Sequence, residues 1–245
     1  MPFGTLTVGD HGIPVFSPPY PATTNQFSDM SMVVITYRIS RSQVQHLVPD
    51  VLELEEEPLV TSIFVTYGMS TVGAYSEFVQ SVEVTYRDEK FDYTLVLVLD
   101  NESAIFAGRE VFGYPKVFGK THLNSSTGSR LINGGVERPV GTRLAEFEFV
   151  LEQLADINPP GSKRTLNLRV IPSPIPGAPP VSKEFIPVVM DMKFNKIWLG
   201  KGHVSFPKTS SVDPWCNLDV LRYEGCFFAS GVSATLCPPK ETFSL

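Results

Sequence analysis

The sequence has few cysteines, no concentrated positive charge and no long apolar run. Its three cysteines, Cys216, Cys226 and Cys237, are odd in number and form no CxxC pair, which excludes a disulfide framework or a zinc pattern. Lys and Arg total 20 against 26 Asp and Glu, a formal net charge of -6, so we expect no nucleic-acid partner. No apolar stretch approaches the roughly 18 residues of a membrane span, and no signal-peptide pattern is present. We therefore expect a cytoplasmic protein with reduced thiols and no membrane partner.

The common short catalytic motifs are also missing. The sequence contains no GxGxxG, Walker-type loop, HExxH or GxSxG, which removes the usual support for nucleotide-binding, zinc-protease and serine-hydrolase functions. The four histidines are scattered and lack the spacing of metal ligands: His11, His46, His122 and His203. We expect no metal site.

The composition is that of a compact globular protein. Of 245 residues, 42% are hydrophobic and 19% are charged, so a sizeable core can form without disulfides. Residues 1–28 mix Pro, Gly, Ser and Thr without periodicity and predict an extended N-terminal arm. Two proline-rich joints, 157–163 and 172–183, are typical of surface turns because strand patterns resume at once on both sides. We expect a single domain over 1–245.

Most of the remaining chain has the texture of β-strands. Short runs rich in β-branched and aromatic residues alternate with polar or Gly-containing joints. Expected strands cover 32–40, 59–69, 77–87, 93–100, 116–124, 143–154, 165–173, 185–206 and 223–237. For 143–154 a helix is also open, but its EFEFV alternation favours a strand. The sequence thus predicts a mainly β (α+β) fold, mostly antiparallel, closed into a barrel or stacked sheets.

Two short helices are expected between these strands. In the first, over 42–48, Ser42 is positioned to cap the helix and Val44 and Leu47 fall on one side. In the second, Asn101 suits a helix N-terminus and is followed by apolar residues at helical spacing.

One lysine lies in an unusually apolar setting. In the segment LDNESAIFAGREVFGYPKVFG, Lys116 is surrounded by Phe112, Val117 and Phe118. Burial disfavours a charged ammonium group and leaves a neutral amine, which can attack a ketone and form a Schiff base. On composition alone, the commoner case is a lysine whose stem covers apolar surface while its amine stays in water.

The segment LDNESAIFAGREVFGYPK closely resembles the lysine-bearing segment of the acetoacetate decarboxylase family. The resemblance extends upstream through VITYRISRSQVQHLVPDVLELEEEPLV and GAYSE, and more loosely downstream through LNLRVIPSPIPG. It implies an antiparallel β-barrel or cone-like domain, assembled into homo-oligomers, with a catalytic lysine in an apolar cavity. Lysine activation by desolvation or by a neighbouring cation is an established property of that family. The protonated imine is itself the electron sink, so the resemblance implies neither a metal nor an organic cofactor.

The resemblance assigns roles to four residues of this chain. Lys116 takes the Schiff-base position, and Glu77, in GAYSE, orients the substrate or takes part in proton transfer. Arg109 and Glu110 match the GRE of the motif, where they are expected to support the loop that carries the lysine.

Three departures from the family pattern affect the expected pocket. Val117 stands where the family has a second lysine, Ser62 aligns with an acid, and Met30 aligns with an arginine. A pocket that lacks these charges favours a substrate larger or less polar than acetoacetate. The expected substrate-binding residues are Met30, Ser62, Phe112, Tyr114 and Val117, with Phe118 and Trp198 as further apolar candidates.

These features leave three functions open. The first is decarboxylation of a β-keto acid through a Lys116 iminium, with secondary metabolism as its setting. The second uses the same iminium as an aldolase, dehydratase or carbon–carbon lyase, since this chemistry permits each reaction. The third, from another class, is a small-molecule binding protein without turnover, consistent with the changes at Met30, Ser62 and Val117.

Overall fold

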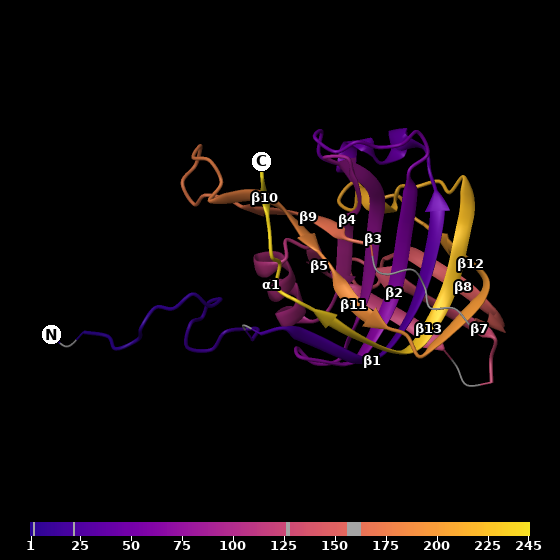
Figure 1. The fold of residues 1–245 in the computed structure, drawn as a ribbon, viewed down its shortest axis with the longest axis horizontal. Helices are drawn as coiled ribbons and strands as arrows, with labels where there is room; N and C mark the ends of the chain where they lie inside the picture. The colour runs from indigo at the N-terminus through magenta and orange to yellow at the C-terminus, as the bar shows by residue number, and fades with distance from the viewer. Residues whose placement is uncertain (2, 22, 126–127, 156–162) are drawn as a thin grey trace.

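The described residues form mainly β-strands, with one α-helix and three 3₁₀ turns among them (Figure 1). The computed structural model describes residues 1–245 except 2, 22, 126–127 and 156–162. The strands are β1 (Asn25–Arg38), β2 (Leu59–Ser70), β3 (Tyr75–Tyr86), β4 (Glu89–Leu99), β5 (Lys116–Phe118), β6 (Lys120–Ser125), β7 (Leu131–Glu137), β8 (Arg143–Leu154), β9 (Thr165–Ile171), β10 (Ser182–Val188), β11 (Met190–Lys193), β12 (Lys196–Ser205), β13 (Arg222–Leu236) and β14 (Phe243–Ser244). The helical elements are α1 (Glu102–Val111), η1 (Arg41–Gln43), η2 (Gln45–Leu47) and η3 (Pro214–Cys216). The predicted mainly β fold with few short helices is confirmed.

The strands join into one strongly curved sheet. Its order is β14-β10-β9-β4-β3-β2-β1-β13-β12-β8-β7-β6, with β11 added on β13 and β5 on β4. Neighbours are antiparallel except where β4 meets β5 and β9. Within the described residues this order is an open path whose ends, β14 and β6, do not pair with each other. The closed barrel expected from the sequence is therefore not confirmed.

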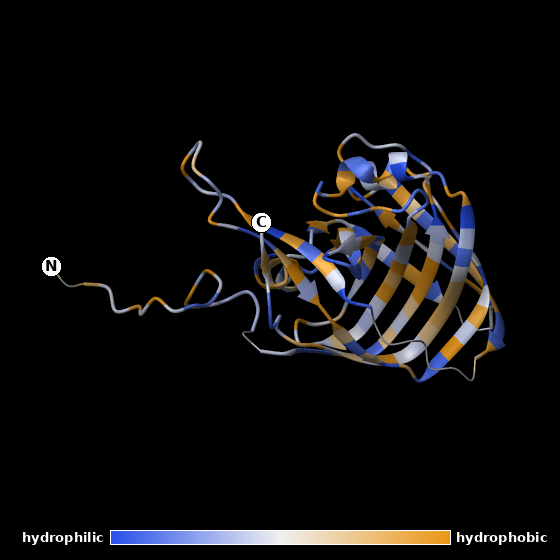
Figure 2. Cartoon of the chain, turned by 45° about the horizontal axis from the view of Figure 1, so that its top comes forward, coloured by the Kyte–Doolittle hydropathy of each residue, from blue (hydrophilic) through white to orange (hydrophobic). Residues whose placement is uncertain are grey.

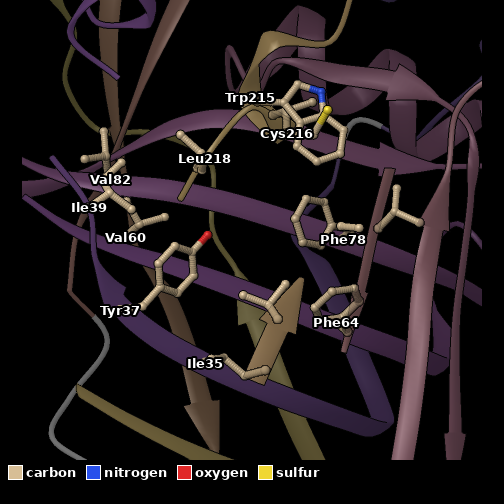
Figure 3. Packing of buried hydrophobic residues seen from close by; sticks show 14 of the residues in the cluster. Ile35, Tyr37, Ile39, Val60, Phe64, Phe78, Val82, Trp215, Cys216 and Leu218 are labelled. Atoms are coloured by element: carbon tan, nitrogen blue, oxygen red, sulfur yellow. The ribbon is translucent and has the colours of Figure 1, made fainter. Parts of the chain in front are cut away.

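Each face of the sheet is covered by its own apolar cluster. Successive side chains of a strand point to opposite faces, and Figure 2 shows the bands of hydropathy that result. One face carries a cluster that includes Phe78 and Trp215, which we call the aromatic core. The centroids of these two rings are 5.4 Å apart (Figure 3). On the other face lies the helix-side core, which includes Met32, Val34 and Ala104. The buried apolar side chains of β1 to β4 therefore belong to one cluster or the other, according to the face of the sheet on which they lie.

Helix α1 follows from local signals in the sequence. The Asn101 side chain accepts a 2.8 Å hydrogen bond from the backbone N–H of Ala104, as expected for an N-cap. The predicted helix after Asn101 is thus confirmed. Ala104, Ala107 and Gly108 are buried, so small residues let the helix pack closely on the sheet.

Two predictions for the first part of the chain are wrong: the end of the arm and the type of helix over 42–48. The arm ends before Asn25, because Asn25 and Phe27 already pair with Leu236 and Ala234 of β13. In place of the helix predicted over 42–48, the chain forms the two 3₁₀ turns η1 and η2, and Ser42 Oγ lies 2.9 Å from the Ser40 hydroxyl.

The second half of the chain also differs in detail from the expected strands. The run 185–206 is split into β10, β11 and β12, and 116–124 is divided at Gly119 into β5 and β6. Strand β7 was not expected, because Gly134 and Gly135 weaken its strand pattern. The strand over 143–154 is confirmed as β8.

Only one of the two proline-rich joints lies within the described residues. Of the joint predicted over 172–183, residues 172–181 connect the antiparallel pair β9–β10, while Ser182 pairs with Ile171 and already belongs to β10. Most of the joint 157–163 lies outside the described residues. Within the described part of the chain, α1 and the shorter turns fall short of the length and apolarity needed to cross a membrane.

Candidate active site

Lys116 is held in the helix-side core by the strand that it begins. It pairs in parallel register with Leu97 of β4, a strand in the middle of the sheet. The Arg109 side chain donates a 3.2 Å hydrogen bond to the Lys116 backbone carbonyl. Only 8% of the Lys116 side chain is exposed, so its amine is almost entirely removed from water.

A buried carboxylate lies opposite this amine. Glu77 is in β3, where it pairs with Val65 of β2 and Leu99 of β4, and its side chain is 3% exposed. Glu77 Oε1 lies 2.7 Å from Lys116 Nζ. Among the described residues this oxygen makes no aligned hydrogen bond, so the contact is an ion pair with poor hydrogen-bond angles. The sequence-predicted catalytic residues, Lys116 and Glu77, are therefore side by side.

The second oxygen of the carboxylate is bound by a tyrosine. The Tyr67 hydroxyl, on β2, donates a 3.1 Å hydrogen bond to Glu77 Oε2. Burial, followed by the negative charge of Glu77, raises the pKa of Tyr67 well above its ordinary value. The hydroxyl therefore keeps its proton at neutral pH and remains a donor.

Two more aromatic rings surround the amine. The ring centroids of Tyr75 and Tyr114 each lie 5.9 Å from Lys116 Nζ. Burial raises the pKa of Tyr114 to about 12, and burial with the Glu77 charge raises the pKa of Tyr75 well above normal. Both phenols stay neutral, and their ring faces suit a cation.

Helix α1 approaches the lysine through a glycine. A Cβ atom at Gly108 would lie 2.4 Å from Lys116 Cδ and 2.6 Å from Cε. Such distances are far below van der Waals contact, so a residue without a side chain is required here. The lysine stem thus lies directly on the helix backbone.

The end of α1 and the loop that follows it are held by side chains from β9 and from the N-terminal arm. Arg169 Nε donates a 2.7 Å hydrogen bond to the Glu110 carbonyl, and the Asn167 amide donates a 2.9 Å bond to the Phe112 carbonyl. The Glu110 carboxylate accepts a short hydrogen bond from the Tyr20 hydroxyl of the arm. The supporting roles of Arg109 and Glu110 stay predictions.

The structure separates the expected substrate-binding residues into two groups. Met30, Phe112 and Tyr114 pack in the helix-side core, on the same face as Lys116. Ser62 is on the other face, where its Oγ lies 3.0 Å from the Tyr37 hydroxyl in the aromatic core. Val117 follows Lys116 in the same strand, so it also points to the aromatic core.

Neither of the two further aromatic candidates lies beside the lysine. Trp198 packs against the aromatic core, and Phe118 is 60% exposed. The two residues that sequence reasoning missed are Tyr67 and Tyr75. They are paired across the β2–β3 hairpin, and their alternation with Glu77 was the available signal.

Two hollows lie near this site without including it. One of about 770 Å³ is lined in part by Phe27, and one of about 240 Å³ between the arm and α1 is lined in part by Phe112. Among the described residues, neither Lys116 nor Glu77 lines either hollow, so the two phenylalanines form walls between the hollows and the helix-side core. In the described ranges, no group of three His, Cys, Asp or Glu side chains is arranged to hold a metal ion.

The arrangement combines a buried nucleophile with a proton acceptor. A carboxylate 2.7 Å from an ammonium group can take its proton and leave a neutral amine. The aromatic and aliphatic surroundings exclude water, which favours an imine over its hydrolysis products. This is the chemistry required for covalent catalysis on a carbonyl compound.

Comparisons with known proteins match this chain to one family and to decarboxylases. The sequence model of the family "Acetoacetate decarboxylase (ADC)" matches residues 12–234. A decarboxylase from Cochliobolus heterostrophus is 36% identical over 230 residues, which cover 91% of this chain and 90% of the relative. An acetoacetate decarboxylase from Chromobacterium violaceum is 30% identical and covers 78% of this chain and 77% of its own length.

Solved structures show the same fold. A structure of acetoacetate decarboxylase superposes with a TM-score of 0.83 over 95% of this chain and 94% of that chain, at 24% identity. The enduracididine biosynthesis enzyme MppR, solved with the condensation product of pyruvate and imidazole 4-carboxaldehyde, has a TM-score of 0.81 at 19% identity and covers 99% of both chains.

Proposed function

This chain belongs to the acetoacetate decarboxylase family, and we propose that it decarboxylates a β-keto acid through an imine on Lys116. The observation that carries the proposal is the buried Lys116–Glu77 pair, with 2.7 Å between Nζ and Oε1. A buried ion pair contributes little net stability, because the desolvation of two charges offsets their attraction. A catalytic role accounts for its retention inside an apolar core.

The proposed reaction begins with proton transfer from the Lys116 ammonium to Glu77. The neutral amine attacks the ketone carbon, the carbonyl oxygen leaves as water, and a protonated imine forms. The bond between the α-carbon and the carboxylate then breaks, carbon dioxide leaves, and the electron pair moves into an enamine. Protonation of the enamine carbon and hydrolysis of the imine release the ketone and return the amine. Glu77 is the group placed to carry protons in these steps.

The expected substrate is less polar than acetoacetate. Met30, where the family has an arginine, pairs with Tyr67 across β1 and β2 and packs in the helix-side core. Val65 and Leu97 on the neighbouring strands are also apolar. A side chain of the substrate would meet hydrocarbon and aromatic surface here, which favours an apolar chain on the keto acid.

Two alternatives remain, each with an observation in its favour. A structural relative was solved with a condensation product, and an enamine on Lys116 could likewise attack a second carbonyl and form a carbon–carbon bond. A binding protein without turnover is favoured by Met30, an apolar residue of the helix-side core at the position where the family has an arginine.

We also propose that the chain forms homo-oligomers. The N-terminal arm leaves the body beside α1 (Figure 1), and its apolar residues Phe3, Ile13 and Phe16 are 95%, 79% and 78% exposed. Apolar side chains on an extended arm gain from burial against a second copy. Light scattering should give a mass of at least twice 27.1 kDa, whereas the mass of a monomer would contradict this. The cytoplasmic setting and a role in secondary metabolism stay predictions.

The proposed reaction is tested by product analysis. The protein is incubated with acetoacetate and with β-keto acids that carry longer apolar chains, and carbon dioxide and ketone are measured. We expect release of carbon dioxide, faster with the longer chains, and its loss in Lys116→Ala. Lys120→Ala, which removes an exposed lysine on β6, is the matched control and should retain activity.

Each other outcome selects an alternative. Carbon–carbon bond products that require Lys116 favour the condensation reaction. Binding without any product in both proteins favours the binding protein. Full activity in folded Lys116→Ala contradicts the covalent mechanism.

A further inference from the structure

We propose that Tyr67 is a positioning residue that aims the Glu77 carboxylate at Lys116, an inference that rests on the proposed function. The two oxygens of Glu77 have separate partners. Oε2 accepts the 3.1 Å hydrogen bond from Tyr67, and Oε1 lies 2.7 Å from Lys116 Nζ. A carboxylate fixed at one oxygen cannot rotate freely, so the other oxygen stays directed at the amine.

Tyr67 is itself rigidly held. Its ring lies between that of Phe27, at 4.9 Å, and that of Tyr75, at 4.6 Å. Met30 is its register partner on β1, and Tyr75 is its partner on β3. A buried ring with neighbours on both sides has one rotamer available, so the hydroxyl is pre-organised for Glu77.

The groups around Glu77 come from several elements of the fold. Lys116 on β5 supplies the positive charge, Tyr67 on β2 donates the hydrogen bond, and the Tyr75 and Tyr114 rings complete the surroundings. Of these groups, the Tyr67 hydroxyl is the one that holds Oε2, while Oε1 faces Lys116. Removing the Tyr67 hydroxyl therefore frees Oε2 and lets the carboxylate rotate away from the amine.

The conservative variant Tyr67→Phe tests this inference, since it keeps the ring packing and removes one oxygen. The hydrogen bonding of the Glu77 carboxyl group is followed by infrared difference spectroscopy, with Glu77→Gln to identify its bands. We expect these bands to shift in Tyr67→Phe, because Oε2 loses its hydrogen-bond donor. Unshifted bands would overturn the proposal, and this readout needs no substrate.

The matched control is Tyr37→Phe. Tyr37 is equally buried, and its hydroxyl has hydrogen-bond partners in the aromatic core, Ser62 and Gln80, on the opposite face. Tyr37→Phe also loses one buried hydroxyl, but the carboxyl bands of Glu77 should not shift. A similar shift in Tyr37→Phe would show a general effect of destabilisation and contradict a specific role for Tyr67.

Turnover separates this inference from the proposed function. With a β-keto acid that the native protein converts, Tyr67→Phe should lower kcat about tenfold and leave KM little changed. If Lys116→Ala stays active, the proposed function fails. If Lys116→Ala is inactive while Tyr67→Phe retains the native kcat, only the positioning role fails.

Discussion

The contact between Gly108 and Lys116 makes an unusual mutational prediction. Glycine in a helix interior ordinarily costs about 1 kcal/mol relative to alanine, so Gly108→Ala would stabilise most helices. Here the new Cβ would lie 2.4 Å from Lys116 Cδ, against an ordinary carbon–carbon contact of about 3.5 Å or more. The lysine stem or α1 must therefore move by about 1 Å. Overpacking of this kind costs about 1–3 kcal/mol.

The net effect on the native protein is destabilisation of about 0–2 kcal/mol, because the gain in helix propensity partly offsets the overpacking. The lysine stem cannot avoid the methyl group freely, since its amine is paired with Glu77 and both side chains are buried. Displacement of the amine by about 1 Å should reduce turnover by about a hundredfold. Turnover should thus fall much more than stability.

A double-mutant cycle isolates the contact. The three atoms nearest to the added Cβ all belong to the Lys116 side chain beyond its Cβ, so Lys116→Ala removes them. In that background Gly108→Ala should stabilise the protein by about 1 kcal/mol, the reverse of its effect on the native chain. Urea unfolding of the four proteins gives the coupling energy. Equal effects in both backgrounds would refute the reasoning.

Three further predictions concern stability. Asn101→Ala, which removes the cap of α1, should cost about 1 kcal/mol in urea unfolding, and an unchanged midpoint would contradict the capping role. Val117→Lys would place an ammonium group against the aromatic core and should lower the melting temperature strongly; a stable variant with a shifted pH optimum would contradict this placement. Hydrogen bonding from Ser182 and the charge of Arg169 lower the pKa of Glu184, so its ionised form stabilises the fold above about pH 4.5, and this stability is lost as the pH falls. Glu184→Gln should reduce the loss of unfolding free energy at acid pH. A pH dependence of the unfolding free energy identical to that of the native protein would argue against this role of Glu184.

The sequence predicts the local features of this fold better than its long-range pairings. Strand texture and the Asn101 cap are encoded within a few residues, and both predictions are confirmed. The start of β1 at Asn25 depends instead on pairing with Leu236, more than 200 residues away, and nothing near Asn25 indicates it. The split of 185–206 into three strands likewise depends on which neighbours each part reaches.

The residues of the candidate site were likewise predicted only in part. Lys116 and Glu77 come from the resemblance, and the structure brings them together. Ser62 aligns with an acid of the family pattern, but an alignment carries no information on which face of a strand a residue occupies. The β2–β3 register pairs Glu77 with Val65, an odd number of residues from Ser62, so Ser62 points away. The same register brings Tyr67 to Glu77.

The central claim is that Lys116 forms an imine with a carbonyl substrate. It is tested most directly by borohydride reduction of the protein in the presence of β-keto acids and ketones, followed by mass spectrometry of the peptides. We expect a reduced adduct on Lys116, absent from Lys116→Ala and unaffected in Lys120→Ala. A ligand that binds and is converted without any adduct on Lys116 would contradict the account.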